Sequence, residues 1–459
     1  MVAVLLGPTG MGINGIFDST IHMLSAFTGF GLGVSAVRDI SEAHSSGDQK
    51  RFSRTLTVLR KLVWITGVFG LLLCLILSPF LSELSFDNSD YVFAFAAISV
   101  TLLFTQLSAG QKALLQGTRH FGYMAKASVI GSIVGLITSV PLYYFLGIKG
   151  IVPAIIIFSF STLVLSWYYS RKVPFSPIKI SYREAFHEGR DMAQMGFFIS
   201  LQTLLSLFTA YIIRIFISRV GGVADVGLFV AGFAIVDTYV GMVFSSMSTE
   251  YYPRLSSHSK AQASEFSSTI NQQIEIAIIL ISPLICLFLV FGNWAVILLY
   301  SEKFLPITIM MCLAILSNYF KAPAWSIAFS FLAKGDSRAF LLNELLSSTI
   351  NTGLKLFFYY KWGLTGIGAA FLLSYFIYFF QVNMICRYRY DYHFDRNILK
   401  TFIPQLSMGA ACFFLFIMFD TWARYFGGCI IIFFSLLVSY KEICKYVNLE
   451  RLLKNKLKR

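Results

Sequence analysis

The chain has 459 residues, of which 56% are hydrophobic and 13% are charged, and its mean hydropathy is +0.70. This composition excludes a soluble globular domain, and continuous rather than alternating hydrophobic runs favour helices over a membrane barrel. The sequence therefore predicts an all-α polytopic membrane protein. The net charge of +14 is interpreted first as membrane topology, and nucleic acid is not an expected partner.

Thirteen hydrophobic runs are long enough to cross a bilayer, for which about 20 residues are needed. In chain order they cover 13–37, 62–81, 91–111, 124–146, 150–170, 193–217, 226–249, 272–292, 304–333, 340–360, 363–386, 401–420 and 424–440.

The connections between these runs differ in their basic residues. Alternate connections, together with the tail 441–459, carry 28 lysines and arginines, whereas the remaining connections carry 4. The positive-inside rule places the basic set in the cytoplasm, so we expect a cytoplasmic C-terminus. Thirteen spans then leave the N-terminus outside without a signal sequence to take it there. We therefore expect a further span before this chain and 14 in the full protein. The alternative is that one run has been divided in two.

The chain contains an internal repeat. The segment YYFLGIKGI at 143–151 resembles YYKWGLTGI at 359–367, at a separation of 216 residues. Arg171 and Arg387 show the same separation, each at the predicted cytoplasmic end of a span. Because this separation includes six spans, an even number, the two halves are expected to be parallel repeats. Two such bundles favour a transporter that works by alternating access, with its site between the halves.

The repeat predicts the domain organisation of the chain. The expected parts are a first bundle at 1–172, a cytoplasmic linker at 173–191, a second six-helix bundle at 192–388, and two extra spans with a basic cytoplasmic tail at 389–459.

Arg214 lies well inside the hydrophobic run Phe197–Val220. An ionisable residue at membrane depth costs at least about 2.5 kcal/mol on insertion scales and usually faces a polar cavity or a partner. The alternative is that its long side chain reaches toward the end of the span near Arg219, about 6 Å away. The residues alone leave both interpretations open.

Asp237 and Lys321 also lie near the middle of predicted spans. A short carboxylate cannot reach far along a helix, so Asp237 favours a polar partner or a cavity. Lys321 follows Ser317 and Asn318 and precedes Pro323, where we expect the helix to be broken. We favour a functional interpretation of both residues.

Four further polar residues are candidates for secondary sites. Glu344 and Lys355 are 11 residues apart and share one helix face, although both lie close enough to a helix end to reach water. Asp18 and His22 are four residues apart on the first span and could form a proton relay, against the simpler interpretation that His22 is hydrated.

Signatures of enzymes and of metal sites are missing from the sequence. There is no phosphate-binding Gly-rich loop with its lysine, no GxSxG and no HExxH, so no catalytic residues are assigned. The seven cysteines are scattered singly, which indicates neither a disulfide framework nor a metal site. No cofactor is expected, apart from H⁺ or Na⁺ as a coupling ion.

Several segments taken together resemble a known family. LLGPTGMGINGIF and LSAFTGFGLGVSAVRDISEA open the chain, and YIIRIFISRVGGVADVGLFVAGFAIVDTYVGMVFSSMSTEYYPRLS follows the linker. SNYFKAPAWSIAFSFLAKGDSRAFLLNELL and YYKWGLTGIGAAFLLSY come next. In this order they resemble the Wzx-type O-antigen flippases, in the polysaccharide-transporter branch of the MATE-like MOP superfamily. The flippases for the lipid carrier of enterobacterial common antigen are especially similar.

The resemblance implies two six-helix bundles plus two extra helices, and the transport of an undecaprenyl-pyrophosphate-linked oligosaccharide across a bacterial inner membrane. It implies that Arg214 and Lys321 neutralise the diphosphate, while Asp237 pairs with one of them or carries the coupling ion. It adds nothing for Asp18, His22 or Lys355. A polysaccharide polymerase and glycosyltransferases are the implied protein partners, in the synthesis of lipopolysaccharide or another surface polysaccharide.

Three other functions are weighed against this one on the residues. A MATE-like exporter of small molecules would share the fold but would require a cavity rich in carboxylates. A lipid II flippase would also require a cationic cavity. A membrane scaffold without transport would leave the charges at membrane depth unexplained.

Overall fold

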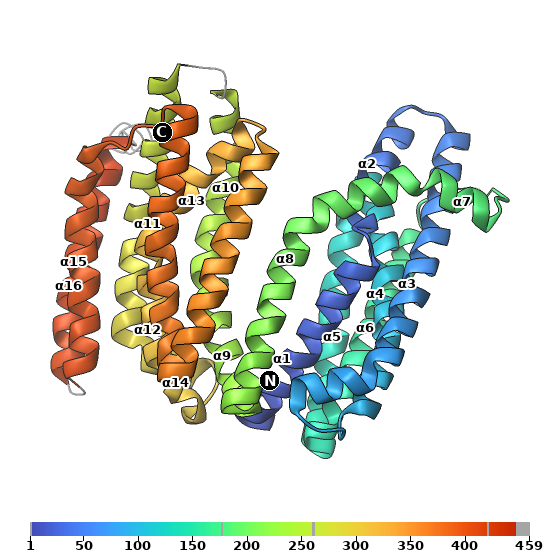
Figure 1. Cartoon of the computed structure of the whole chain (residues 1–459), viewed down its shortest axis with the longest axis horizontal. Helices are drawn as coiled ribbons and strands as arrows, with labels where there is room; N and C mark the ends of the chain where they lie inside the picture. Colours follow the sequence, from blue (N-terminus) through green and yellow to red (C-terminus); the bar gives the residue numbers. More distant parts are fainter. Residues whose placement is uncertain (1, 176–177, 259–261, 420–421, 447–459) are drawn as a thin grey trace, which may run out of the picture. The chain divides into compact units, whose positions relative to one another are not determined.

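The computed structural model describes residues 2–175, 178–258, 262–419 and 422–446 (Figure 1). The chain packs as two compact units, Met1–Gly227 and Leu228–Arg459. Throughout the described residues the regular structure is helical, as the sequence predicts for a polytopic membrane protein. The part of the predicted basic tail at 447–459 lies outside the described residues.

The first unit contains the helices up to the linker and the long helix after it. They are α1 (Val2–Thr28), α2 (Leu32–Ser45), α3 (Gln49–Phe86), α4 (Val92–Gly117), α5 (Phe121–Leu146), the 3₁₀ turn η1 (Gly147–Gly150), α6 (Ile151–Ser170), α7 (Tyr182–Glu188) and α8 (Arg190–Gly221).

The second unit begins within α9 (Val223–Ile235). The elements that follow are the π-helical turn η2 (Val236–Val240), α10 (Gly241–Ser257), α11 (Ala263–Leu299), η3 (Glu302–Ile307), α12 (Thr308–Leu316), α13 (Asn318–Ala333), α14 (Ser337–Tyr390), η4 (Arg396–Ile398), α15 (Leu399–Met418) and α16 (Trp422–Tyr446).

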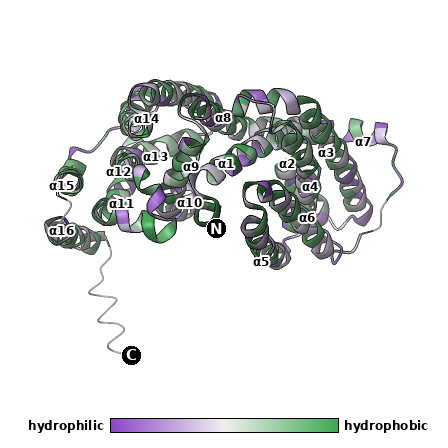
Figure 2. Cartoon of the chain, turned by 90° about the horizontal axis from the view of Figure 1, so that it is seen from below, coloured by the Kyte–Doolittle hydropathy of each residue, from purple (hydrophilic) through white to green (hydrophobic). Residues whose placement is uncertain are grey.

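Within the described residues, nine helical stretches are long and apolar enough to cross a membrane, or up to eleven if each of two bent helix pairs forms one span. Two of the nine, 121–170 and Ser337–Tyr390, are interrupted by a sharp turn near the middle. Counting the two sides of each turn separately adds two spans to the eleven and makes thirteen, the number that the sequence predicts. Figure 2 shows hydrophobic residues over most of these helices and hydrophilic ones gathered at the connections.

The two sharp turns have the same backbone conformation. Gly147 has φ 57° and ψ −134°, and Gly363, 216 residues later, has φ 58° and ψ −143°. Only glycine adopts this backbone conformation, with positive φ, without a steric cost. Three residues on, Gly150 and Gly366 lie against the carbonyl oxygens of Leu142 and Phe358, where an added Cβ would be 2.3 and 2.1 Å from the oxygen.

A second pair of turns repeats at the same separation. α4 ends with Arg119 in the left-handed region, and the His120 amide donates to the Leu115 carbonyl at 2.8 Å. α13 ends with Gly335 in the left-handed region, and the Asp336 amide donates to the Phe331 carbonyl at 2.9 Å. Both are Schellman caps, which satisfy carbonyl groups left free at a helix C-terminus. The sequence repeat is therefore present in the local backbone conformation of these turns.

In the first unit, α1 packs against the start of α9, and the turn before α2 packs against α8, both through glycines. A Cβ on Gly12 would lie 1.9 Å from the Val223 carbonyl oxygen, and one on Gly31 would lie 2.1 Å from that of Gly196. These contacts join α8 and the start of α9 to the helices before the linker. The grouping reflects packing, whereas the predicted domain bounds follow the sequence repeat, so those bounds stay a prediction.

Two of the predicted spans are bent, and one of the bends lies where the sequence did not place it. The run 13–37 is broken at Gly29–Gly31, where Gly31 has φ 62°, and α1 and α2 meet at 48°. The break expected at Pro323 lies instead at Ser317, where α12 and α13 meet at 42°. Ser317 and Asn318 side chains donate to carbonyl groups of the preceding turn, which competes with the regular helix, whereas Pro323 is accommodated inside α13.

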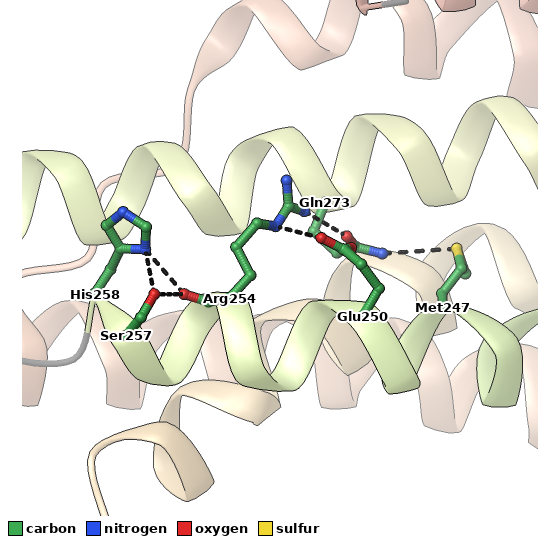
Figure 3. A network of polar contacts seen from close by, with 6 residues as sticks. All are labelled: Met247, Glu250, Arg254, Ser257, His258 and Gln273. Atoms are coloured by element: carbon green, nitrogen blue, oxygen red, sulfur yellow. Dashed lines mark hydrogen bonds and ion pairs between the residues drawn. The ribbon is translucent and has the colours of Figure 1, made fainter.

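Polar networks join helices at the ends that the positive-inside rule assigns to the cytoplasm. In the second unit, Arg254 on α10 contacts Glu250 at 3.3 Å and donates to Gln273 on α11 at 3.0 Å (Figure 3). In the first unit, Arg54 on α3 donates two hydrogen bonds to Glu188 at the end of α7. These contacts tie helices together outside the apolar core.

Candidate functional site

Arg214 lies on α8 and interacts electrostatically with Asp18 on α1. The Arg214 side chain is half-buried, and its Nε is buried without a hydrogen-bond partner among the described residues. Arg219, in contrast, donates to the carbonyl oxygens of Glu83 and Leu84 at 2.8 and 2.9 Å, which places it at the C-terminal end of α3. The two arginines therefore have different neighbours, and the carboxylate that attracts Arg214 lies within the helices of the first unit.

Asp18 is positioned by its own helix. Asn14 Nδ2 donates to Asp18 Oδ2 at 2.8 Å, one turn earlier on α1. His22, one turn later, interacts electrostatically with Asp18 and is exposed. The structure thus brings Asp18, His22 and Arg214 together in the first unit, although only Asp18 and His22 were grouped from the sequence.

A second cluster of charges forms in the second unit around Lys355. This residue is only 7% exposed, on the first side of the break in α14. Its ammonium lies 3.7 Å from the ring centroid of Phe371, on the other side of the break, and 5.9 Å from that of Phe233 on α9. Lys355 interacts electrostatically with Asp237 by attraction and with Lys321 by repulsion.

Lys321 lies on α13 and is half-buried. Its ammonium is 5.2 Å from the ring centroid of Phe244 and 5.5 Å from that of Tyr375. Among the ion pairs of the described residues, none within 4.0 Å involves Lys321. Aromatic faces attract an ammonium group but carry no net negative charge, so among the described residues no carboxylate within 4.0 Å offsets Lys321.

Asp237 lies in the π-helical turn η2 between α9 and α10, and its side chain is exposed. Single π turns inside helices are rare and often occur at functional sites, because the extra residue redirects the side chains around it. The cluster of Asp237, Lys321 and Lys355 contains two cations and one carboxylate.

Glu344 belongs to a separate network between the two sides of α14. Tyr378 donates to Glu344 at 3.0 Å, and Asn343 donates to Tyr378 at 3.3 Å. Gln381 donates to Asn343 Oδ1 at 2.8 Å. Glu344 and Lys355, which share a helix face by spacing, therefore have different recorded partners in the described part of the chain.

Sequence reasoning missed the aromatic rings around the two lysines. Phe233, Phe244, Phe371 and Tyr375 are four of many aromatic residues in hydrophobic runs, and no spacing marks them. It also missed Arg424 at the start of α16, which is 1% exposed, donates to the Val290 carbonyl at 3.1 Å and lies over the Phe416 ring. Arg424 is the first residue of the predicted run 424–440, and a charge at the end of a run does not stand out.

Helices of spanning length, a repeated backbone and charges inside the helical units define a multi-pass membrane protein with polar groups at membrane depth. A model of the family described as "Polysaccharide biosynthesis protein" matches residues 1–309. Because this match covers more than half of the chain, the chain belongs to that family.

Two characterised relatives are similar over most of the chain. The lipid III flippase of Escherichia coli K12 is 21% identical over 389 residues, which are 83% of this chain and 90% of the relative. The stage V sporulation protein B of Bacillus subtilis 168 is 22% identical over 386 residues, which are 77% of this chain and 72% of the relative.

Solved structures have the same fold. The lipid II flippase MurJ in an inward closed conformation matches with a TM-score of 0.66 and 14% identity, over 95% of this chain and 97% of that one. An inward-facing multidrug resistance MATE transporter of the MOP superfamily matches with a TM-score of 0.67 and 14% identity, over 87% and 96%. The predicted fold of MOP-type transporters is thereby confirmed.

Proposed function

We propose that the chain is a flippase that moves an undecaprenyl-pyrophosphate-linked oligosaccharide across the bacterial inner membrane, from the cytoplasmic to the periplasmic face. Membership of the polysaccharide biosynthesis family supports this function, as does the similarity to a lipid III flippase. The oligosaccharide is a repeat unit of O-antigen or another surface polysaccharide, delivered by glycosyltransferases and passed to a polymerase.

The observation that carries the proposal is the charge of Lys321. It is half-buried between the rings of Phe244 and Tyr375 and has no carboxylate within 4.0 Å in the described chain. A cation kept at membrane depth without an ion pair is costly unless an anion occupies the site for part of the cycle. The diphosphate of a polyprenyl carrier is such an anion, whereas a cationic drug would be repelled.

The other charged residues have complementary roles in this proposal. Arg214, whose Nε has no partner, offers a planar fork suited to phosphate oxygens, and Lys321 acts as a point charge. Lys355 raises the positive charge near Lys321, and Asp237 counters it. The polyprenyl tail stays in lipid while the two halves alternate between an inward-open and an outward-open state.

The carboxylates Asp18 and Asp237 are the candidates for the coupling ion, either H⁺ or Na⁺. Each interacts with a cation of its own cluster, so binding of an ion to the carboxylate changes how strongly that cation attracts the diphosphate. Transport in vesicles with an imposed pH or Na⁺ gradient, for wild type and for Asp237→Asn, tests this role. We expect one gradient to accelerate transport by the wild type but not by the variant. Acceleration of both would remove Asp237 from coupling.

The function is tested by reconstituting the full chain in vesicles with a fluorescent undecaprenyl-pyrophosphate-linked oligosaccharide and measuring its movement between leaflets. We expect Lys321→Gln to slow transport by about tenfold to a hundredfold, since a charge-assisted contact is worth about 1.5–3 kcal/mol. Lys361→Gln, at an exposed lysine of α14, is the matched control and should transport normally. Wild-type rates for Lys321→Gln would remove this residue from the site.

The same vesicles distinguish the competing functions. Efflux of a cationic dye by the wild type, without movement of the lipid-linked sugar, would replace the proposal by a MATE-like exporter. Movement of lipid II in preference to the undecaprenyl-linked oligosaccharide would replace it by a lipid II flippase.

A further inference from the structure

The first unit has a groove of about 390 Å³ between α3, α4 and α6 that the proposed transport site does not use. Arg60 on α3 and Arg171 just after α6 line one end of it, the end that the positive-inside rule assigns to the cytoplasm. Trp64, Trp167 and Leu163 line the apolar part. The groove therefore combines a cationic end with a hydrophobic body.

The two arginines have like charges close enough to repel each other. Within the described residues, neither takes part in an ion pair within 4.0 Å. The Arg171 guanidinium lies 4.0 Å from the Trp167 ring centroid, and that of Arg60 lies 4.3 Å from the Phe175 ring centroid. Stacking on a ring occupies the face of a guanidinium and leaves its N–H edge free to donate. Two such edges suit a phosphate group better than any neutral partner.

Gln111 on α4 supplies a third polar group in the groove. Its Oε1 accepts a hydrogen bond from Ser170 Oγ at 2.5 Å. This contact occupies the carbonyl oxygen of the Gln111 side chain. The NH₂ group of the same side chain is then the part that can donate a hydrogen bond to a ligand. A phosphate ester oxygen is a matching acceptor.

The apolar part of the groove continues along the outside of two helices. Trp64 is 50% exposed and Trp167 is 43% exposed. Val68 and Leu72 on α3 and Phe160 on α6 are exposed as well. In a membrane-spanning helix such residues lie against acyl chains, and an indole at the end of a span lies at the headgroup level.

The groove is a feature of one half of the repeat. The positions 216 residues after Arg60 and Gln111 are Ile276 and Ile327. The second half thus lacks two of the three polar groups, which indicates a local site rather than a general property of the basic cytoplasmic face.

We infer that this groove binds an anionic phospholipid of the surrounding membrane, with its phosphodiester between Arg60 and Arg171 and one acyl chain along Trp64 and Leu163. In membrane proteins, basic pockets between helices on the cytoplasmic side bind anionic lipid headgroups. The bound phosphodiester places one negative charge between two repelling cations, and the lipid fills the groove, so it stabilises the first unit. The inference does not depend on the proposed flippase function.

Native mass spectrometry of the full chain in detergent tests the site, with phosphatidylglycerol and phosphatidylcholine of identical acyl chains as the probes. We expect the wild type to retain one phosphatidylglycerol in preference to phosphatidylcholine. Arg60→Gln/Arg171→Gln should weaken that binding by about tenfold or more. Lys179→Gln/Arg183→Gln removes the same charge from exposed positions near α7 and should bind as the wild type does.

A second variant shows whether loss of the lipid comes from the groove or from misfolding of the first variant. Leu163→Trp keeps both arginines and fills the groove, so it should also lose the lipid. Equal retention of both lipids by the wild type would overturn the inference. Equal loss of phosphatidylglycerol by Lys179→Gln/Arg183→Gln and by Arg60→Gln/Arg171→Gln would also overturn it. That result would indicate a general attraction of the lipid to the basic face of the protein. Tighter binding of undecaprenyl diphosphate than of phosphatidylglycerol, abolished by Arg60→Gln/Arg171→Gln, would assign the groove to the transported lipid instead.

Discussion

The ammonium of Lys355 lies 3.7 Å from the centroid of the Phe371 ring, across the sharp turn that divides α14. The aromatic face attracts the buried cation and takes the place of part of its lost hydration. Because the two residues come from the two sides of the turn, the position of this charge depends on the turn at Trp362–Gly363. Lys355 in turn acts on Lys321 and Asp237.

Lys355→Met should leave the fold nearly unchanged but slow transport. Methionine has a similar shape, so we expect the free energy of unfolding to change by less than about 1.5 kcal/mol. Loss of the charge weakens attraction for an anionic substrate, so the flipping rate should fall by about tenfold or more. Thermal unfolding and the vesicle assay measure the two effects. Lys303→Met, at an exposed lysine of η3, serves as the control. A stable variant with normal transport would contradict the prediction.

Asp18 and Arg214 should be coupled energetically. In a double-mutant cycle of Asp18→Asn and Arg214→Gln, we expect a coupling energy of about 0.5–3 kcal/mol in thermal stability, because each single change leaves a charge of the pair without its counterpart. The double variant should be more stable than the sum of the two single losses predicts. Additive losses would mean that the electrostatic interaction between α1 and α8 contributes nothing to folding.

The glycines between α1 and α9 should tolerate no side chain. A Cβ on Gly12 would meet the Val223 carbonyl oxygen at 1.9 Å, and one on Gly227 would meet that of Pro8 at 1.8 Å. Because both obstacles are backbone atoms, the helices must separate, and we expect Gly12→Ala to cost about 1–3 kcal/mol. Gly353→Ala on α14 is the matched control, since no atom lies within 4 Å of its added Cβ. Unfolding in detergent compares them, and equal midpoints would refute this packing.

The attachment of α7 to α3 should depend on pH through Glu188. The hydrogen bonds from Arg54 lower the pKa of the Glu188 carboxyl group. A carboxyl pKa lowered by folding contributes stability above its unfolded value of about 4.3, and this contribution is lost as the pH falls through the lower folded value. We therefore expect α7 to stay attached from pH 7 to pH 5 and to be released below about pH 4.

Hydrogen exchange of the α7 amides, corrected for the intrinsic pH dependence, measures this release. Glu188→Gln should exchange at pH 7 as the wild type does at low pH. Glu302→Gln, at an exposed carboxylate of the second unit, should leave α7 protected. Protection of α7 in Glu188→Gln would show that other contacts, such as Lys61 with the Ile180 carbonyl, hold this helix.

The spans and the repeat could be predicted from the sequence because each depends on local properties. A hydrophobic run of about 20 residues crosses a bilayer whatever its neighbours are. The glycines at 147 and 363 mark turns because their φ values exclude most other residues. The helix break before α13 could not be located, because Pro323 and the Ser317–Asn318 pair are both capable of bending a helix.

The candidate site was predicted only in part. The charges at Arg214, Asp237 and Lys321 are visible because they interrupt hydrophobic runs. Which charges meet depends on the rotation of each helix about its axis, which the sequence of a single chain does not specify. The attraction between Asp18 and Arg214 and the aromatic rings near Lys321 therefore emerged only from the structure.

The turns at Gly147 and Gly363 share one backbone conformation, but the residues around them differ in charge. Lys355, eight residues before Gly363, corresponds to Ser139 in the first half, and Lys321 corresponds to Thr105. The two halves thus share the backbone conformation of these turns but differ in the charged side chains near them. The charge at these positions can therefore differ while the backbone conformation of the turns stays the same. Exchanging Lys355 with Ser139 and Lys321 with Thr105 would move these two charges from the second half to the first.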